Sequence, residues 1–138
     1  MVGYSGTPLP KKLGVKPETT LALIGAPADF GATLGELPDR VRTKTRAAGS
    51  ADVVVAFFTK RSQLERRLEP LAKVIYPGGG LWIAWPKRSS GVETDITEDV
   101  VRELALAGGL VDNKVCAIDE TWSGLRLVYR LRDRPKKT

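Results

Sequence analysis

Polar side chains that could bind or react gather in four short segments, each directly after an apolar run. The segments are 25–29 (GAPAD), 59–62 (TKRS), 86–91 (PKRSSG) and 119–124 (DETWSG). Two adjacent Lys-Arg pairs beside serines can hold a phosphate or a carboxylate. The candidate ligand-binding residues are Lys60, Arg61, Lys87, Arg88, Ser89, Ser90, Asp119, Glu120 and Trp122, with Gly25 and Asp29 in the first segment.

The composition excludes several kinds of catalytic site. The 138 residues include no histidine and one cysteine, Cys116. A serine–histidine or cysteine–histidine nucleophile and a structural zinc site are therefore excluded. We assign no catalytic residue, no metal ligand and no cofactor. Any chemistry would have to rest on Asp, Glu, Lys or Tyr side chains, or on binding alone.

A second interpretation of the charged segments stays open beside the first. The cations can be solvated loop side chains, with Ser62 only a helix cap. Trp122 is expected at a hairpin tip, where an indole needs either packing or a ligand. Trp82 and Trp85 are expected in the core, and Cys116 is expected to be a small buried hydrophobe.

The net charge of +6 is unevenly distributed along the chain. Residues 93–120 are mostly acidic, whereas the end of the chain is basic, with 132–138 expected to be a flexible tail. Aromatic residues make up 7% of the chain and do not alternate with the cations. The sequence therefore lacks the stacking platform of proteins that bind single-stranded nucleic acid.

Unbroken apolar runs indicate the elements that carry these segments. Strands are expected at Thr19–Gly25, Val53–Phe58 and Leu81–Trp85, a weak edge strand at 40–44 (RVRTK), and a final hairpin from "NKVCAID" and "LRLVYRL". Helices are expected after a Thr7 cap, over Pro27–Leu37, after a Ser62–Glu65 capping box with a kink or restart at Pro70, and from Thr97 to Ala107.

Alternating strands and helices of this kind predict a single α/β domain over residues 1–138. We expect three layers around a Rossmann-like, mostly parallel open sheet with an antiparallel C-terminal hairpin strand. Val53–Phe58 and Leu81–Trp85 should be adjacent, central and parallel. No apolar run is long enough to span a bilayer, and the lone cysteine fits a cytoplasmic protein. The carboxyl ends of the parallel strands, where ligands bind in such sheets, should carry all four polar segments.

The runs "LGVKPETTLALIG", "ADVVVAFF" and "VIYPGGGLWIAW" resemble strands of class I S-adenosylmethionine-dependent methyltransferases. The segments "GYSGTPLPKKLGVKP", "WPKRSSG" and "CAIDETWSGLRLVYR" resemble a small uncharacterised bacterial family that is classed as a domain of unknown function. The first resemblance implies a glycine-rich loop after the first strand and an acid at the end of the second. Here Gly25 is kept, Pro27 is inserted, and "RTKTR" replaces the acid; the chain also looks one βα unit short.

These departures indicate a non-catalytic, methyltransferase-like module that binds a small anionic ligand or a protein partner at the carboxyl edge of the sheet. A divergent S-adenosylmethionine-dependent methyltransferase is the alternative. A nucleic-acid-binding protein that uses the basic tail and edge is the second alternative. No membrane partner is expected.

Overall fold

A computed structural model describes residues 7–135 and contains one six-stranded sheet in the order β2-β1-β3-β4-β6-β5. Its strands are β1 (Thr20–Ile24), β2 (Arg42–Lys44), β3 (Val53–Phe57), β4 (Gly80–Pro86), β5 (Leu110–Ala117) and β6 (Trp122–Tyr129). β1 is parallel to β2 and β3, and β3 is parallel to β4. β6 runs antiparallel between β4 and β5. The mostly parallel sheet with an antiparallel hairpin is thus confirmed.

The two central strands are also where the sequence predicted them. β3 and β4 pair in parallel from Val53↔Gly80 to Phe57↔Ala84. Every residue of both strands is buried, because helices cover both faces. β2 is the edge strand, and residues 45–52 between it and β3 contain no helix. The sheet therefore ends where the methyltransferase resemblance implies a further βα unit.

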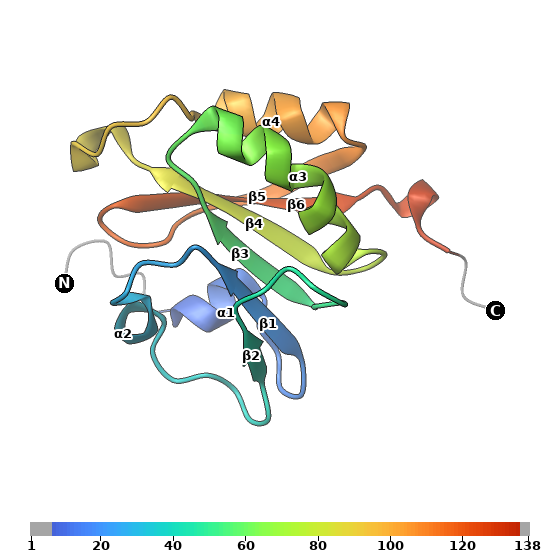
Figure 1. Cartoon of the computed structure of the whole chain (residues 1–138). Helices are drawn as coiled ribbons and strands as arrows, with labels where there is room; N and C mark the ends of the chain where they lie inside the picture. The colour runs from blue at the N-terminus through green and yellow to red at the C-terminus, as the bar shows by residue number, and fades with distance from the viewer. Residues whose placement is uncertain (1–6, 136–138) are drawn as a thin grey trace.

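Helices lie on both faces of the sheet and complete the three layers (Figure 1). α3 (Arg61–Ile75) and α4 (Glu98–Ala107) cover one face. α1 (Leu9–Leu13) and α2 (Phe30–Leu34) lie on the other. Two short 3₁₀ turns, Arg88–Ser90 and Leu131–Asp133, follow β4 and β6.

Each face of the sheet has its own apolar cluster. Under α3 and α4, Leu64, Leu71 and Ile83 are among the fully buried side chains. On the other face, Trp82 is completely buried, and its Nε1–H donates to the carbonyl oxygen of Leu13 at 2.9 Å. This bond ties the C-terminal end of α1 to the centre of the sheet.

The sequence misplaced the starts of α1 and α2, and also the end of α2. α1 begins after Pro8, which offers no side-chain cap, so Thr7 is not the cap; Gly14 ends the helix in the left-handed conformation. The helix expected over Pro27–Leu37 is only the five residues of α2. Gly35 ends the helix early. Its φ of 76° is a backbone conformation that glycine adopts readily and other residues adopt at a cost.

The Ser62–Glu65 capping box was a wrong prediction, since α3 already begins at Arg61. The carboxylate of Asp95, distant in sequence, accepts the Arg61 backbone N–H at 2.7 Å instead. Glu65 bonds the Arg61 side chain at 3.2 Å. α3 also runs without a break through Pro70, which lies on the exposed side of the helix, as does Arg66 one turn earlier.

Replacing Asp95 with alanine should therefore destabilise the fold by about 1–2 kcal/mol, because the first N–H of α3 loses its acceptor. Urea unfolding measures the change. Ser62→Ala is the control and should change stability by less than about 0.5 kcal/mol, because Ser62 is exposed and caps nothing. Equal losses in both variants would contradict the assignment of Asp95 as the cap.

Candidate functional site

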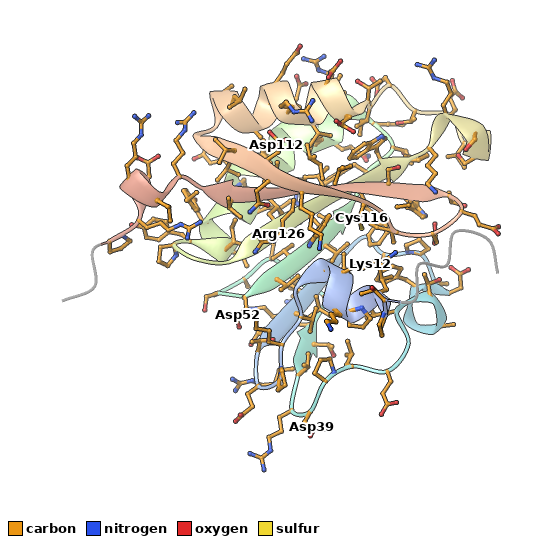
Figure 2. The ribbon with its side chains drawn as sticks, turned by 180° about the vertical axis from the view of Figure 1, so that it is seen from behind. Lys12, Asp39, Asp52, Asp112, Cys116 and Arg126 are labelled. Atoms are coloured by element: carbon orange, nitrogen blue, oxygen red, sulfur yellow. The ribbon has the colours of Figure 1, made fainter. Side chains whose placement is uncertain are left out.

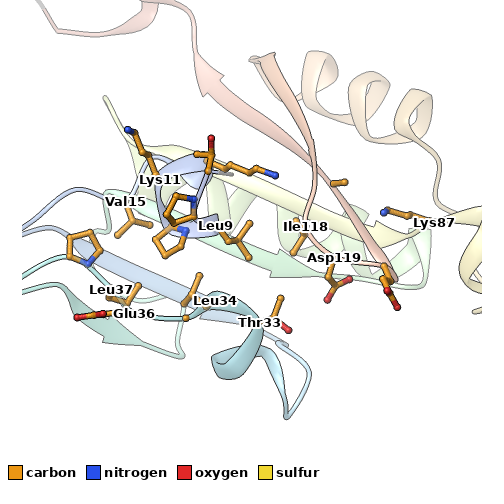
Figure 3. Close-up of a pocket in the computed structure, with 18 residues that line it drawn as sticks. Leu9, Lys11, Val15, Thr33, Leu34, Glu36, Leu37, Lys87, Ile118 and Asp119 are labelled. Atoms are coloured by element: carbon orange, nitrogen blue, oxygen red, sulfur yellow. The ribbon is translucent and has the colours of Figure 1, made fainter. Parts of the chain in front are cut away.

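A cavity of about 1080 Å³ opens beside the carboxyl ends of β4 and β5, on the face that carries α1 and α2 (Figure 3). Its walls come from α1, the segment from α2 to Pro38, and the β5–β6 turn. The apolar lining is formed mainly by Leu9, Val15, Leu34, Leu37 and Ile118. The cavity thus joins parts of the chain that lie more than a hundred residues apart in sequence, such as Leu9 and Glu120.

Charged side chains line the same cavity in both signs. Lys11, Lys12 and Lys87 line it together with Glu36, Asp119 and Glu120. Lys87 and Asp119 lie at one end of the cavity, while Glu36 lies on the wall formed after α2 (Figure 3). Asp119 Oδ1 accepts the backbone N–H groups of Thr121 and Trp122, both at 2.8 Å, which fixes the hairpin turn. The cavity can therefore hold a molecule with an apolar body and a charged group at one end.

Two lysines of this cavity lie near Cys116, together with Lys114. Burial raises the pKa of the half-buried Cys116 thiol, and the charges of Lys12, Lys114 and Lys87 lower it by smaller amounts. Lys114 Nζ also donates to the carbonyl oxygen of Lys12 at 3.0 Å. None of these lysines forms an ion pair within residues 7–135.

The residues predicted from sequence separate into two groups. Lys87, Asp119 and Glu120 line the cavity. The other candidates at the ends of β3 and β4, namely Lys60, Arg61, Arg88, Ser89 and Ser90, do not. Arg61 is engaged with Asp95 and Glu65 at the start of α3. The Ser90 hydroxyl donates to the Lys87 carbonyl oxygen at 2.6 Å and so shapes the turn.

Sequence patterns gave no reason to include the α1 residues in the site. Leu9, Lys11 and Lys12 belong to a short helix near the N-terminus that looked only like a lead-in to β1. What the sequence does show is how the helix is bounded, by prolines at 8 and 10 and by Gly14 at its end. These residues determine where in the sequence the helix begins and ends, but not which strand it packs against.

An aromatic cluster occupies the carboxyl end of β3, next to the switch point where β1 is flanked by β2 and β3. The Phe57 ring packs edge-on against the rings of Phe30 and Trp122, with centroid distances of 4.9 Å and 5.0 Å. Phe30 and Phe57 are buried, and Trp122 is half-buried. Packing against Phe57 therefore accounts for the indole at the hairpin, without a ligand.

The loop after β1 shows why its glycine is present. Gly25 has φ 66°, and a Cβ there would lie 3.3 Å from the Phe57 carbonyl oxygen. The glycine thus allows the ends of β1 and β3 to approach each other. Asp29 lies exposed just before α2 and makes no side-chain capping bond.

Structural comparison defines the class of the fold. The chain has the Rossmann-like fold of class I S-adenosylmethionine-dependent methyltransferases. It is similar to a SAM-dependent methyltransferase from Aquifex aeolicus (TM-score 0.61, 18% identity, covering 85% of this chain and 85% of that chain). It is also similar to the Methanococcus jannaschii fibrillarin pre-rRNA processing protein (TM-score 0.58, 17% identity, 89% and 69% covered). No family model and no curated protein matches the chain.

The residues present do not fit S-adenosylmethionine in the manner that the fold implies. Lys44 stands at the end of β2 in place of an acid, and its ammonium donates to the carbonyl oxygens of Ala48 and Ser50. Gly25 serves strand packing, and Ala26 and Pro27 follow it. The carbonyl oxygen of Phe57, whose ring packs against Phe30 and Trp122, lies next to Gly25. The chain therefore has neither the ribose-binding acid nor the glycine-rich loop of the family it resembles.

Within residues 7–135, no group of three or more Cys, Asp or Glu side chains is arranged to hold a metal ion. In the same range, no helix has the length and apolar character required to cross a membrane.

Proposed function

We propose that this chain is a non-catalytic binding module on a methyltransferase fold, which takes a small amphipathic anion into the cavity at the carboxyl edge of its sheet. The observation that carries the proposal is the cavity itself, which combines an apolar lining with charged residues that include Lys12 and Lys87. The apolar body of the ligand would contact Leu9, Leu34 and Ile118. Its anionic group would lie near the two lysines. The single cysteine supports a reducing, cytoplasmic setting.

The charge arrangement supports an anion at that end of the cavity. Asp119 lies near Lys87 in Figure 3, but one of its oxygens is already bonded to two backbone N–H groups. The charges of Lys12 and Lys87 both lower the pKa of the Cys116 thiol, and neither lysine forms an ion pair within residues 7–135. A ligand anion there would gain from partial burial, because exposed ion pairs contribute little.

The alternative function is that of a divergent S-adenosylmethionine-dependent methyltransferase. What supports it is the fold likeness to enzymes such as the magnesium protoporphyrin IX methyltransferase from Synechocystis, whose structure has been solved with SAM bound (TM-score 0.54, 10% identity, covering 88% of this chain and 74% of that chain). Binding of S-adenosylmethionine separates the two functions. The module should not bind it, whereas the enzyme must.

Calorimetry and thermal unfolding should show saturable binding of an amphipathic carboxylate such as decanoate, and no binding of S-adenosylmethionine. Thr33→Trp should weaken binding of the carboxylate at least about tenfold, because the half-buried Thr33 lines the cavity and an indole there would obstruct it. Lys87→Ala should also weaken it, through loss of the ammonium.

Ala32→Trp is the matched control, since Ala32 is exposed on the same helix and does not line the cavity. The affinity of this variant for the carboxylate should stay within about twofold of that of the unmodified chain. Micromolar affinity for S-adenosylmethionine would favour the enzyme instead. Equal binding by the Thr33→Trp and Ala32→Trp variants would place the ligand outside the cavity.

A further inference from the structure

Arg126 lies half-buried on β6, away from the cavity lining, with its guanidinium against the backbone of Gly80. A Cβ at Gly80 would lie 2.5 Å from Arg126 Nε and 2.7 Å from Cζ and Nη2. Only glycine leaves this room at the first residue of β4. The guanidinium therefore occupies the space that a side chain at residue 80 would need. Figure 2 shows that Arg126, Cys116 and Lys12 all lie on the face of the molecule that α1 occupies.

The charges next to this guanidinium are also positive. Lys114 is the direct cross-strand partner of Arg126 in the β5–β6 hairpin. Like charges directly opposite each other destabilise a sheet. Burial, and to a smaller degree the charge of Arg134, lower the pKa of Arg126. Each of these effects opposes a cation at this position.

Little within the described chain compensates for that cost. Arg126 Nη1 donates to the amide oxygen Oδ1 of Asn113 at 3.3 Å. Among the ion pairs of residues 7–135, none includes Arg126 or Lys114. A partly buried charge without a counter-charge is unfavourable, whereas a bound anion would relieve both the burial and the repulsion.

We propose that Arg126 and Lys114 bind a phosphate group on the β5–β6 hairpin, beside α1, with Asn113 and Gly80 positioning the guanidinium. A guanidinium donates two parallel N–H bonds to a phosphate, and the adjacent ammonium reaches a third oxygen. A carboxylate has only two oxygens and cannot satisfy both cations in this way. Asn113 and Lys114 are exposed, so the phosphate can belong to a larger molecule.

The site is tested by titrating ¹⁵N-labelled protein separately with inorganic phosphate, a nucleoside monophosphate and a short single-stranded oligonucleotide. Saturable shifts of the Arg126 Nε–H, Lys114 and Asn113 signals are expected with at least one probe. The tightest of the three probes identifies the source of the phosphate as a free ion, a nucleotide or a nucleic-acid strand. Absence of saturable shifts with every probe would overturn the proposal.

Gly80→Ala gives the sharpest variant, because it leaves every cation in place. The new Cβ would clash only with the end of the flexible Arg126 side chain, so the guanidinium should be displaced while the fold persists. Affinity for the probe should fall about tenfold, as in Arg126→Ala. Arg66→Ala removes the same charge from an exposed position of α3, on the opposite face of the sheet, and should leave affinity within about twofold.

Thermal unfolding of each variant confirms that it is folded before binding is compared. If Gly80→Ala and Arg126→Ala bind the probe as tightly as the unmodified chain, the proposal is wrong. If Arg66→Ala weakens binding as much as Arg126→Ala, overall charge rather than this site binds the probe, and the proposal is also wrong.

Discussion

Replacing Trp82 with alanine is expected to lower the free energy of unfolding by about 3–5 kcal/mol. The indole is 0% exposed at the centre of the sheet, so its removal leaves a large cavity between β4 and α1. It also removes the donor to the Leu13 carbonyl oxygen. Urea unfolding followed by far-UV circular dichroism measures the loss without relying on tryptophan fluorescence.

Trp82→Phe separates the two contributions. It keeps much of the aromatic packing but leaves the Leu13 carbonyl oxygen without its indole partner, at a cost of about 1–3 kcal/mol for the buried acceptor, in addition to the lost ring volume. Its total loss should therefore remain below that of Trp82→Ala. A loss of under about 1 kcal/mol in Trp82→Ala would contradict the central position of this side chain.

Gly79→Ala should cost about 1–3 kcal/mol or more, because its Cβ would meet backbone rather than side chains. It would lie 2.9 Å from the carbonyl oxygens of Ala51 and Asp52 and 3.0 Å from that of Ile75. These atoms belong to the start of β3 and the end of α3, which can yield only by shifting the backbone. Chemical denaturation quantifies the loss.

The preceding glycine is the matched control. A Cβ at Gly78 would have no heavy atom within 4 Å. Gly78→Ala should leave stability unchanged within about 0.5 kcal/mol, or raise it slightly by restricting the unfolded chain. Similar losses at both positions would show that the turn as a whole, rather than the contacts of Gly79, demands glycine.

This turn also shows how far sequence reasoning carries. The run Gly78–Gly80 leads from the end of α3 into the buried strand β4. Its members nevertheless have different surroundings: solvent at Gly78, backbone at Gly79 and the Arg126 guanidinium at Gly80. Local pattern predicts that a turn occurs, but only tertiary packing determines what each glycine faces.

The strands were predictable for a related reason. Val53–Phe57 and Gly80–Pro86 are apolar without alternation, and burial on both faces leaves few other arrangements. The C-terminal hairpin followed from its alternating residues. Helix starts were less predictable, since Asp95 caps α3 from thirty-four positions away in sequence. No window of neighbouring residues contains that interaction.

The candidate site was only partly predictable. Lys87, Asp119 and Glu120 were identified because they follow strands, and the cavity contains them. The same reasoning selected Lys60 and Arg61, which the Asp95 interaction and α3 hold elsewhere. The α1 residues escaped notice, because their contribution depends on the Trp82 bond to Leu13 rather than on their own sequence.

The irregular register of β5 has a consequence for how the molecule behaves when crowded with copies of itself. β5 is an edge strand, and its pairing with β6 shifts between Asp112 and Lys114. An open edge is a template on which another chain can add a strand, and continued addition leads to aggregation. A bulge with a neighbouring lysine interrupts that template midway. The longer outer strand of this sheet thus carries its own protection against fibre-like growth.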